Sequence, residues 1–478
     1  MAAQEETKNT SKFLVGSCLG MCPYAEQRLR QRERLIHPLE MAVDSNGGRL
    51  NYVQMRAMVK EFSRSAAGHE IKASDIRPLP VLVKTVKYLL MSACCRQDVS
   101  WALVYQFVSD RLHAVRQDLC VQGVKNDMSI QVYQAAVRFY VYAHYRTCEH
   151  GLSDFDPYLN KKHLTETLTL VISLFQDQDK DKKEPCVDTK RFGDAMSVCS
   201  SSDEDDNEEA RDNPDDKEDA NESKIVQDTK TSEKDNVSGR TESNVTNLRN
   251  PEVSHIRDED PGDEDTETAR DLNEDEDWRN LSDMSRRTTV PQEGRRGESR
   301  NVVITDYTLR EEAEALYLLV NFGNEEALLH VLELPKHIRF SQLVSIVTEM
   351  NFAWLTRNYC RVLRLAAFLP PLFLCAFHPH LTMIQKTALG ILSRAHSSKG
   401  LVYRQDDLAA ILLIPSSQDL ADACRHYGLT VVDGGISFTK GAFKWDVPLM
   451  KLSRVKWVDD KLNTIQLPEL LLPAGRSP

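Results

Sequence analysis

The sequence predicts a mainly α-helical protein that carries a long disordered acidic insertion and ends in a small module of helices and a hairpin. Three observations predict this fold class. Apolar residues recur every three or four positions through residues 24–175 and again from residue 308, which is the period of an amphipathic helix. Residues 176–301 are polar and acidic instead. From residue 401 onward, short β-prone runs alternate with the helical pattern.

The net charge of the chain is unevenly distributed. The 478 residues carry a formal net charge of −12, but residues 177–300 hold 38 acidic and 20 basic residues. The remaining residues are therefore mildly basic, with 40 basic and 34 acidic groups. A mildly basic folded part admits an acidic partner, although it is far less basic than a dedicated nucleic-acid-binding domain.

Neither the N-terminus nor the apolar runs predict a membrane protein. Residues 1–12 are polar and contain no apolar core of the length that a signal peptide needs. The longest apolar region, residues 363–377, contains Arg364 and two prolines, and it is shorter than the roughly 20 residues that span a bilayer. We expect a cytoplasmic or nuclear protein that has no contact with a membrane.

The 11 cysteines show no disulfide spacing, and we expect reduced thiols. Cys18 with Cys22, and Cys94 with Cys95, are the two local groupings. A structural zinc site needs two spaced ligand pairs, and neither grouping is followed by a second pair. The sequence therefore predicts no metal site and no cofactor, and these thiols are interpreted as small buried side chains.

The part before the insertion predicts consecutive amphipathic helices. The first covers residues 25–40 and is rich in arginine; the next two cover residues 55–65 and 80–93. Ser100 is placed to cap a further helix, and the segment from Ser129 repeats the apolar pattern. The aromatic residues of the last segment are interpreted as core, with a base-stacking stripe as the alternative. They are Tyr133, Phe139, Tyr140, Tyr142 and Tyr145.

Residues 176–301 are expected to be disordered, because so few large apolar side chains cannot offset the entropy of the chain. Helical regions flank the segment, so it is interpreted as a long loop within one superhelix. Ser200, Ser201 and Ser202 each have an acidic residue three positions later. This is the pattern of acid-directed kinases, and we expect phosphorylation there, with incidental modification as the alternative.

Helices resume after the insertion. Thr308 and Glu311 have the spacing of a capping box. A shorter helix is expected over residues 325–332, and a longer helical run over residues 341–368 ends at Pro370 and Pro371. Antiparallel helix pairs of this size stack into a superhelix.

The C-terminal part predicts a winged helix. A helix over residues 381–395 is followed by a short strand at 401–403, a helix capped by Asp406 or Asp407, and a helix that starts at Ser416. Residues 429–438 then form two β-prone runs across an Asp-Gly-Gly turn, which indicates a hairpin. Helix, strand, helix, helix and hairpin is the order of a winged helix.

These patterns divide the chain into six predicted parts. They are a disordered N-terminus (1–15), the first helical part (16–175), the disordered acidic insertion (176–301), continued helical repeats (302–378), the winged helix (379–447) and a C-terminal tail (448–478).

Seven short segments, taken in order, resemble the SAC-three/GANP family. They are CLGMCP at 18–23 with Glu26 and Arg28, VKEFSRSAA at 59–67, IRPLPVL at 76–82, VSDR at 108–111 with RQD at 116–118, RF at 138–139, and YGLTVVDG at 427–434. The resemblance implies a TPR/PCI-like helical superhelix capped by a PCI-type winged helix. It also implies a non-catalytic scaffold whose partners are a PCI-type subunit and a small acidic subunit.

The resemblance implies two alternative cellular roles. Long members of the family act in mRNA export and carry phenylalanine-glycine repeats and an acetyltransferase-like domain, which this sequence lacks. Short members are associated with the centrosome and the mitotic spindle. We expect a role in centrosome duplication, spindle assembly and mitotic progression, with a subunit of a nuclear mRNA-export complex as the alternative.

The residues themselves favour binding over catalysis. The sequence has no phosphate-binding glycine motif, no GxSxG and no HExxH. Asp154 and Asp156 are interpreted as ordering the turn before Pro157, and His144 as a core histidine. No enzymatic activity and no small-molecule substrate are expected.

Basic residues around the predicted winged helix are the candidate partner or nucleic-acid surface. A surface there would contact phosphates or a second PCI-type subunit, and an ordinary solvated surface is the alternative for each residue. The candidates are Lys399, Arg404, Arg425, Lys440 and Lys444.

Overall fold

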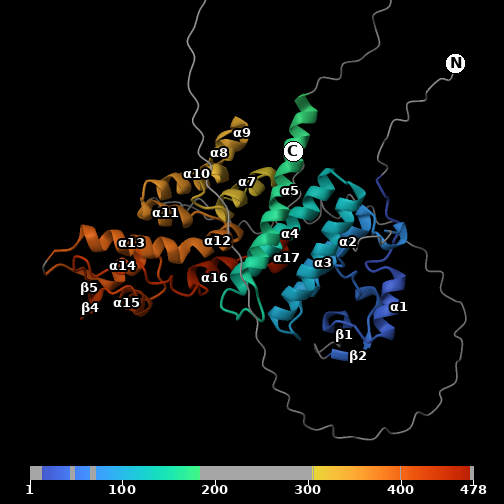
Figure 1. The fold of residues 1–478 in the computed structure, drawn as a ribbon, viewed down its shortest axis with the longest axis horizontal. Helices are drawn as coiled ribbons and strands as arrows, with labels where there is room; N and C mark the ends of the chain where they lie inside the picture. Colours follow the sequence, from blue (N-terminus) through green and yellow to red (C-terminus); the bar gives the residue numbers. More distant parts are fainter. Residues whose placement is uncertain are drawn as a thin grey trace, which may run out of the picture. The chain divides into compact units, whose positions relative to one another are not determined.

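The protein is mainly helical, as predicted (Figure 1). The computed structural model describes residues 13–43, 49–64, 71–183, 304, 306–398 and 400–473. All of these residues belong to one unit, which spans 1–185 and 272–478. Residues 184–303 lie outside the described part, so the predicted disordered insertion is untested there.

The described helices and strands fall into three groups along the chain. The first holds α1 (Tyr24–Arg32), β1 (Met41–Val43), β2 (Arg49–Val53), α2 (Leu79–Met91), α3 (Trp101–Gln122), α4 (Asp127–Arg146) and α5 (Pro157–Lys183). The second holds α7 (Leu309–Val320), α8 (Glu325–Leu332), α9 (Lys336–Arg339), α10 (Gln342–Leu355), α11 (Tyr359–Ala366) and α12 (Pro371–Phe377). The third holds α13 (Leu381–Ala395), β3 (Val402–Arg404), α14 (Gln405–Leu412), α15 (Ser417–His426), β4 (Thr430–Val432), β5 (Gly435–Ser437), α16 (Lys456–Leu462) and α17 (Leu467–Leu471).

Helix α4 is at the centre of the core. It packs against α2, α3 and α5 of the first group and against α7, α12 and α17 of the later groups. Tyr133, Phe139, Tyr140 and Tyr145 are buried on it, and Tyr142 is half-buried. Burial raises the pKa of Tyr140 to about 12. The interpretation of these aromatic residues as core is confirmed.

Helices from before and after residues 184–303 share this core. The Arg138 side chain on α4 forms a buried ion pair with Glu312 on α7, with Nε 2.6 Å from Oε1. Helix α5 also packs against α7. The described helices on the two sides therefore pack together in one core.

Residues 448–473 return to this core and are not a simple tail. The backbone carbonyls of Leu470 and Leu472 accept hydrogen bonds from Arg138. The hydroxyl of Tyr145 lies 2.9 Å from Asp459 on α16. Short helices such as α16 and α17 are difficult to predict because tertiary packing, more than propensity, stabilises them.

Several helix starts match the sequence prediction. Thr308 and Glu311 form the predicted capping box. The Ser100 hydroxyl accepts from the Leu103 amide, and the Ser416 hydroxyl accepts from the Asp419 amide. The segment from Ser129 lies in α4, which begins at Asp127 and has Asn126 as its N-cap.

Other predicted helix bounds are wrong. Of the predicted helix over residues 55–65, the structure describes residues 55–64, which contain one 3-10 turn, η2 (Met55–Ala57), in place of a helix; the first helix ends at Arg32. The run 341–368 is two helices, α10 and α11, because the chain turns at Arg357, which has a φ of 60°. Pro370 and Pro371, which were expected to end a helix, also begin α12 as its N-cap and first residue.

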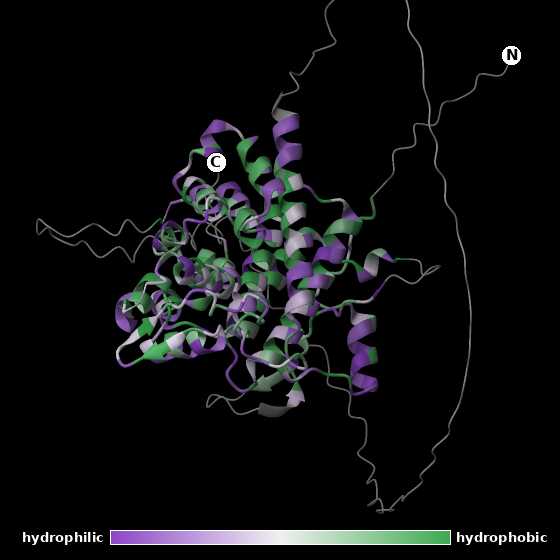
Figure 2. Cartoon of the chain, turned by 60° about the vertical axis from the view of Figure 1, so that its left-hand side comes forward, coloured by the Kyte–Doolittle hydropathy of each residue, from purple (hydrophilic) through white to green (hydrophobic). Residues whose placement is uncertain are grey.

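Helix α5 continues to Lys183, past the predicted end at residue 175. Its last turns are hydrophilic, as Figure 2 shows, so the apolar period gave no signal there. Asp177 pairs with Lys125 and Asp179 pairs with Arg310. These contacts to α7 and to the start of α4 hold the polar end of α5.

One described segment, Ala73–Cys95, is apolar and long enough to cross a membrane by length and composition alone, with a mean hydropathy of 1.3. It consists of η3 (Ala73–Asp75), α2 and η4 (Ala93–Cys95). The α2 side chains Leu82, Val86 and Leu89 are buried, and α2 packs against α3 and α4. A core helix meets the same criteria, so the finding assigns no membrane contact.

The C-terminal module has a three-stranded antiparallel sheet in the order β3-β5-β4. Val431 pairs with Ile436 across the predicted hairpin, and Tyr403 pairs with Ile436 from the other side. Helices α14 and α15 lie between β3 and β4 in the sequence. The N-cap of α14 is Arg404, and Asp406 and Asp407 lie in its first turn instead of capping it.

Candidate functional site

The four described residues of the predicted binding surface are exposed but do not form one patch. Arg404 pairs with Gly435 at the hairpin-turn end of β5, whereas Lys440 follows Ser437 at the opposite end. Lys444 lies near the end of α15, since its amide donates to the Tyr427 carbonyl. Lys399 lies outside the described residues.

Two of these four cations have acidic neighbours. Arg425 forms an ion pair of 2.7 Å with Asp422, and Arg404 lies 3.6 Å from Asp407. Lys440 and Lys444 have no ion-pair partner among the described residues. Lys440 and Lys444 therefore carry unpaired exposed charges, whereas Arg425 and Arg404 each have an aspartate beside them. The predicted phosphorylation sites Ser200, Ser201 and Ser202 lie outside the described residues.

Several of the short segments that carry the family resemblance contribute to two buried ionic clusters. Arg30 on α1 is 2% exposed, and its guanidinium makes two hydrogen bonds, of 2.8 and 3.0 Å, to the buried Glu40 carboxylate. It also donates to Glu61 at 2.8 Å, and Glu61 accepts from Arg111 at 2.8 Å. Charge-assisted pairs of this kind need each buried charge to be matched.

A second cluster centres on Asp118 of α3. Its carboxylate accepts from Lys60 at 2.6 Å and from the Arg77 guanidinium at 2.7 Å. Gln122, one turn later, donates to the Arg77 carbonyl and accepts from the Gly16 amide. The two clusters together tie residues 16–23, 59–61 and 76–77 to α3.

These contacts explain why the predicted helix over residues 55–65 is absent. The amide of Val59 donates to Glu40, the amide of Lys60 to the Met21 carbonyl, and the amide of Glu61 to Glu26. Because these backbone amides donate to distant partners, they are not available for the hydrogen bonds of a helix, and the chain stays extended.

Burial sets the protonation of the groups around the first cluster. It raises the pKa of the Glu26 carboxyl, although the Glu61 amide and Arg30 oppose the shift. Burial also lowers the pKa of His37, with the Arg111 charge acting in the same direction. These shifts belong to a structural network, because each group is occupied by protein partners.

Cys18 and Cys22 are both buried, and burial raises the pKa of both thiols. They are therefore protonated near neutral pH and are poor metal ligands or nucleophiles. Among the described residues, no three His, Cys, Asp or Glu side chains are grouped so that they could hold a metal ion.

Helix α1 presents a surface that sequence reasoning did not resolve. Arg30 is its only buried residue. Tyr24 is 70% exposed and Leu29 is 47% exposed. The arginines of this helix are regularly spaced, so the sequence did not indicate which of them is buried. Arg30 is buried because it pairs with Glu40 and Glu61, which are distant in the sequence.

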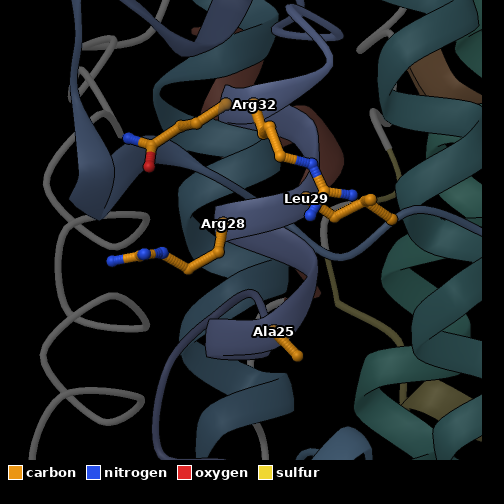
Figure 3. A pocket seen from close by; sticks show the side chains of 5 residues that line it. Ala25, Arg28, Leu29 and Arg32 are labelled. Carbon is orange, nitrogen blue, oxygen red and sulfur yellow. The ribbon is translucent and has the colours of Figure 1, made fainter.

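Two hollows flank Leu29 and Ala25. The first, of about 650 Å³, lies over α1 and is lined by Arg28, Gln31 and Arg32 in addition to those two residues (Figure 3). The second, of about 410 Å³, lies between α1, η3 and α3 and is called the α1 groove here. Its apolar lining is Pro23, Ala25, Leu29, Ile71, Ile76 and Val121. Its polar lining is Glu26, Lys60, Ser63, Arg64, Asp75 and Gln117.

The arrangement of α1 suits binding better than catalysis. Its pockets offer exposed apolar side chains and arginines, and its residues Glu26, Arg30 and Arg32 are held in ion pairs. His144, which the sequence interpretation placed in the core, is half-buried: burial lowers its pKa to about 4, and its ring contacts Phe155 edge-on. Asp156 accepts from the Tyr158 and Leu159 amides and so orders the start of α5.

Comparisons with known proteins agree with the resemblance. A family model described as the SAC3/GANP family matches residues 21–228 and 295–433. SAC3 family protein B of Arabidopsis thaliana is 29% identical over 180 residues, which cover 37% of this chain and 10% of that protein. SAC3 family protein 1 of Schizosaccharomyces pombe is 32% identical over 136 residues, which cover 28% of this chain and 13% of that protein.

A third relative, the Drosophila melanogaster protein xmas, is 26% identical over 186 residues, which cover 37% of this chain and 9% of that protein. The chain therefore spans about a tenth of the length of these curated relatives. The roles of those longer proteins carry over to this chain only as proposals.

Proposed function

The chain belongs to the SAC3/GANP family, and from this premise we propose that it is a non-catalytic scaffold that binds a protein partner through its C-terminal module. The matched family and relatives indicate no enzyme family. A scaffold requires a stable core and an exposed complementary surface, and it requires no activated nucleophile or metal.

The single observation that carries this proposal is the sheet at the end of the helical stack. Residues 381–438 have the element order of a winged helix, with β5 in the middle and β3 and β4 at the two edges of the sheet. Edge strands present backbone donors and acceptors that another chain can pair with. We propose that this module is a PCI-type winged helix and that it pairs with a PCI-type subunit, alongside a small acidic subunit.

Charge supports the same surface. Lys440 and Lys444 are exposed beside the sheet, and Arg425 is exposed at the end of α15. Complementary charge across an interface steers association and sets specificity. The proposed partner therefore presents acidic groups to these three residues.

We further propose that the scaffold acts in centrosome duplication, spindle assembly and mitotic progression. The support is the likeness of its predicted parts to the short members of the family. Imaging of the tagged protein through the cell cycle tests this role. Signal on centrosomes and spindle poles is the expected result, and a nuclear-envelope signal with none at the poles would contradict it.

A subunit of a nuclear mRNA-export complex is the second candidate function. The observation that favours it is that the ammonium groups of Lys440 and Lys444 have no ion-pair partner among the described residues, so both can neutralise phosphates. Depletion of the protein would then retain polyadenylated RNA in the nucleus. An unchanged RNA distribution would exclude this function.

A further inference from the structure

The α1 groove combines an apolar lining with two cations, Lys60 and Arg64, and two carboxylates, Glu26 and Asp75. Leu29 separates it from the hollow over α1, and Ile71, on the other side of the groove, is 41% exposed. Exposed apolar side chains gathered in a groove are a common feature of binding sites for peptides.

Among the described residues, two cations beside Leu29 lack an ion-pair partner: Arg64 lines the α1 groove, and Arg28 lines the adjoining hollow over α1. Arg28 contacts only the Tyr24 ring and hydroxyl, and Arg64 has no ion-pair partner among the described residues. Of the acidic lining, Glu26 is already engaged, since it binds the Glu61 amide and lies 3.6 Å from Arg30. Asp75 accepts from the Ser74 hydroxyl but has no ion-pair partner among the described residues, so its carboxylate remains one negative charge in the lining. An acidic ligand can therefore pair with Arg64 in the groove and with Arg28 in the adjoining hollow.

The walls of the groove are fixed in place before any ligand binds. Arg30 anchors α1 to Glu40 and Glu61, and Lys60 is held by Asp118 and by the Asp75 carbonyl. A preorganised site loses little conformational entropy on binding, so a short peptide segment suffices as a ligand.

The chain itself contains a segment of matching chemistry, outside the described residues. Residues 272–284 read LNEDEDWRNLSDM, in which four consecutive carboxylates precede Trp278 and Leu281 follows three positions later. Trp278 is the single tryptophan of residues 177–300. The other dense acidic run, DEDDNEE at 203–209, contains no apolar side chain that could enter the groove.

We propose that residues 272–284 dock on the α1 groove. Trp278 and Leu281 contact the apolar lining beside Leu29, and the carboxylates of residues 274–277 face Arg28 and Arg64. Aromatic anchors surrounded by complementary charge supply most of the binding energy in interfaces of this size.

The connection to the described chain permits this contact. Residues 285–305 separate the segment from Asp306, and a chain of that length reaches up to roughly 70 Å when extended. A flexible tether of this kind gives an effective concentration on the order of a millimolar. Even a weakly binding segment then occupies the groove for much of the time. A ligand from another molecule would need to compete with this tethered segment.

Photo-crosslinking in the purified full-length chain tests the proposal. The photo-reactive residue benzoylphenylalanine replaces Leu29, or Arg64 as a second position, and Tyr158, which is 79% exposed and outside the groove, is the control position. Mass spectrometry then identifies the linked peptides. Circular dichroism confirms that each protein is folded, so that at least one groove position is informative.

The expected product links position 29 or 64 to residues 272–284 within one molecule, at a yield that does not change on dilution. The double substitution Trp278→Ala/Leu281→Ala lowers this yield about tenfold, as loss of an anchor does. The matched control Val245→Ala/Leu248→Ala, with the same spacing in the same insertion, leaves it unchanged. Cross-links to other segments, to a second copy of the chain or to a co-purified protein, or no cross-link from a folded groove variant, would overturn the proposal.

Discussion

Arg138 on α4 and Glu312 on α7 are joined by a buried, two-point ion pair, although 174 positions separate them in the sequence. The remaining nitrogen of the guanidinium, Nη1, donates to the carbonyls of Leu470 and Leu472. One side chain thus connects the helices before the insertion, the helices after it and the C-terminal residues.

Removal of one partner of this pair is expected to be strongly destabilising. Glu312→Gln leaves the Arg138 charge buried without its counter-ion, which costs about 3–5 kcal/mol of unfolding free energy. Chemical denaturation measures the change. The double variant Arg138→Met/Glu312→Leu is expected to recover much of the loss because no unpaired charge remains.

The exposed pair of Arg361 and Glu349 is the matched control. Its side chains are 56% and 39% exposed, so Glu349→Gln is expected to change stability by less than about 1 kcal/mol. Equal losses from Glu312→Gln and Glu349→Gln would show that burial of the pair is not what holds the helices together.

The insertion is expected to be dispensable for folding, provided that α5 is left whole. Replacement of residues 190–295 by a short Gly/Ser linker should leave the thermal unfolding transition nearly unchanged, since the removed residues cannot build a core. Replacement from residue 177 onward should lower it, because it removes Asp177 and Asp179 and their pairs with Lys125 and Arg310. A large loss of cooperativity in the first variant would reveal structure within the insertion.

Local sequence signals predicted the local features of the fold. Thr308 and Glu311 define a helix start by their own side chains, and so do Ser100 and Ser416. The hairpin around Gly434 is a second case, because Gly434 adopts a φ of 71° that glycine permits. Such contacts join residues that are only a few positions apart, so they can be predicted from the local sequence.

Contacts between distant segments were not predictable in the same way. Residues 55–65 have a helical pattern, but Glu40, Met21 and Glu26 capture their amides. Arg30 is one of several similar arginines, and only Glu40 and Glu61 distinguish it. Arg404 and Lys440 were both predicted to belong to one binding surface. Arg404 pairs with Gly435 at one end of β5, however, whereas Lys440 follows the other end of that strand.

Acidification is expected to destabilise the fold through buried histidines. Burial lowers the pKa of His378 to about 4 from its ordinary value of 6.5, and its Nδ1 has no hydrogen-bond partner among the described residues. Below pH 6.5, His378 is protonated in the unfolded chain but stays neutral in the folded chain. The free energy of unfolding therefore falls as the pH is lowered from 6.5 to 4. The loss is up to roughly 3 kcal/mol for one such group.

Urea denaturation at several pH values checks this prediction. His378→Gln retains a donor for the Ser453 carbonyl but has no group to titrate, so its stability should fall less steeply than that of the wild-type protein. Parallel curves for the two proteins between pH 6.5 and 4 would refute the role of His378.

The triple variant Arg425→Glu/Lys440→Glu/Lys444→Glu is expected to stay folded, within about a kilocalorie of the wild-type protein, because all three side chains are exposed. If this surface binds nucleic acid, affinity falls and the slope of log affinity against log salt flattens, because the variant neutralises fewer phosphates. Fluorescence anisotropy with a labelled RNA measures both. An unchanged slope would assign the surface to protein contact or to solvent.

The most direct test of the scaffold function is quantitative affinity purification of the native protein and of the folded triple variant from the same cells. A PCI-type subunit is expected to co-purify with the native protein in near-equimolar amount, because edge strands and matched charges pair the two modules. Its recovery should fall about tenfold or more with the triple variant. No PCI-type subunit with the native protein, or equal recovery with both, would contradict the proposal that this module pairs the scaffold with a PCI-type partner.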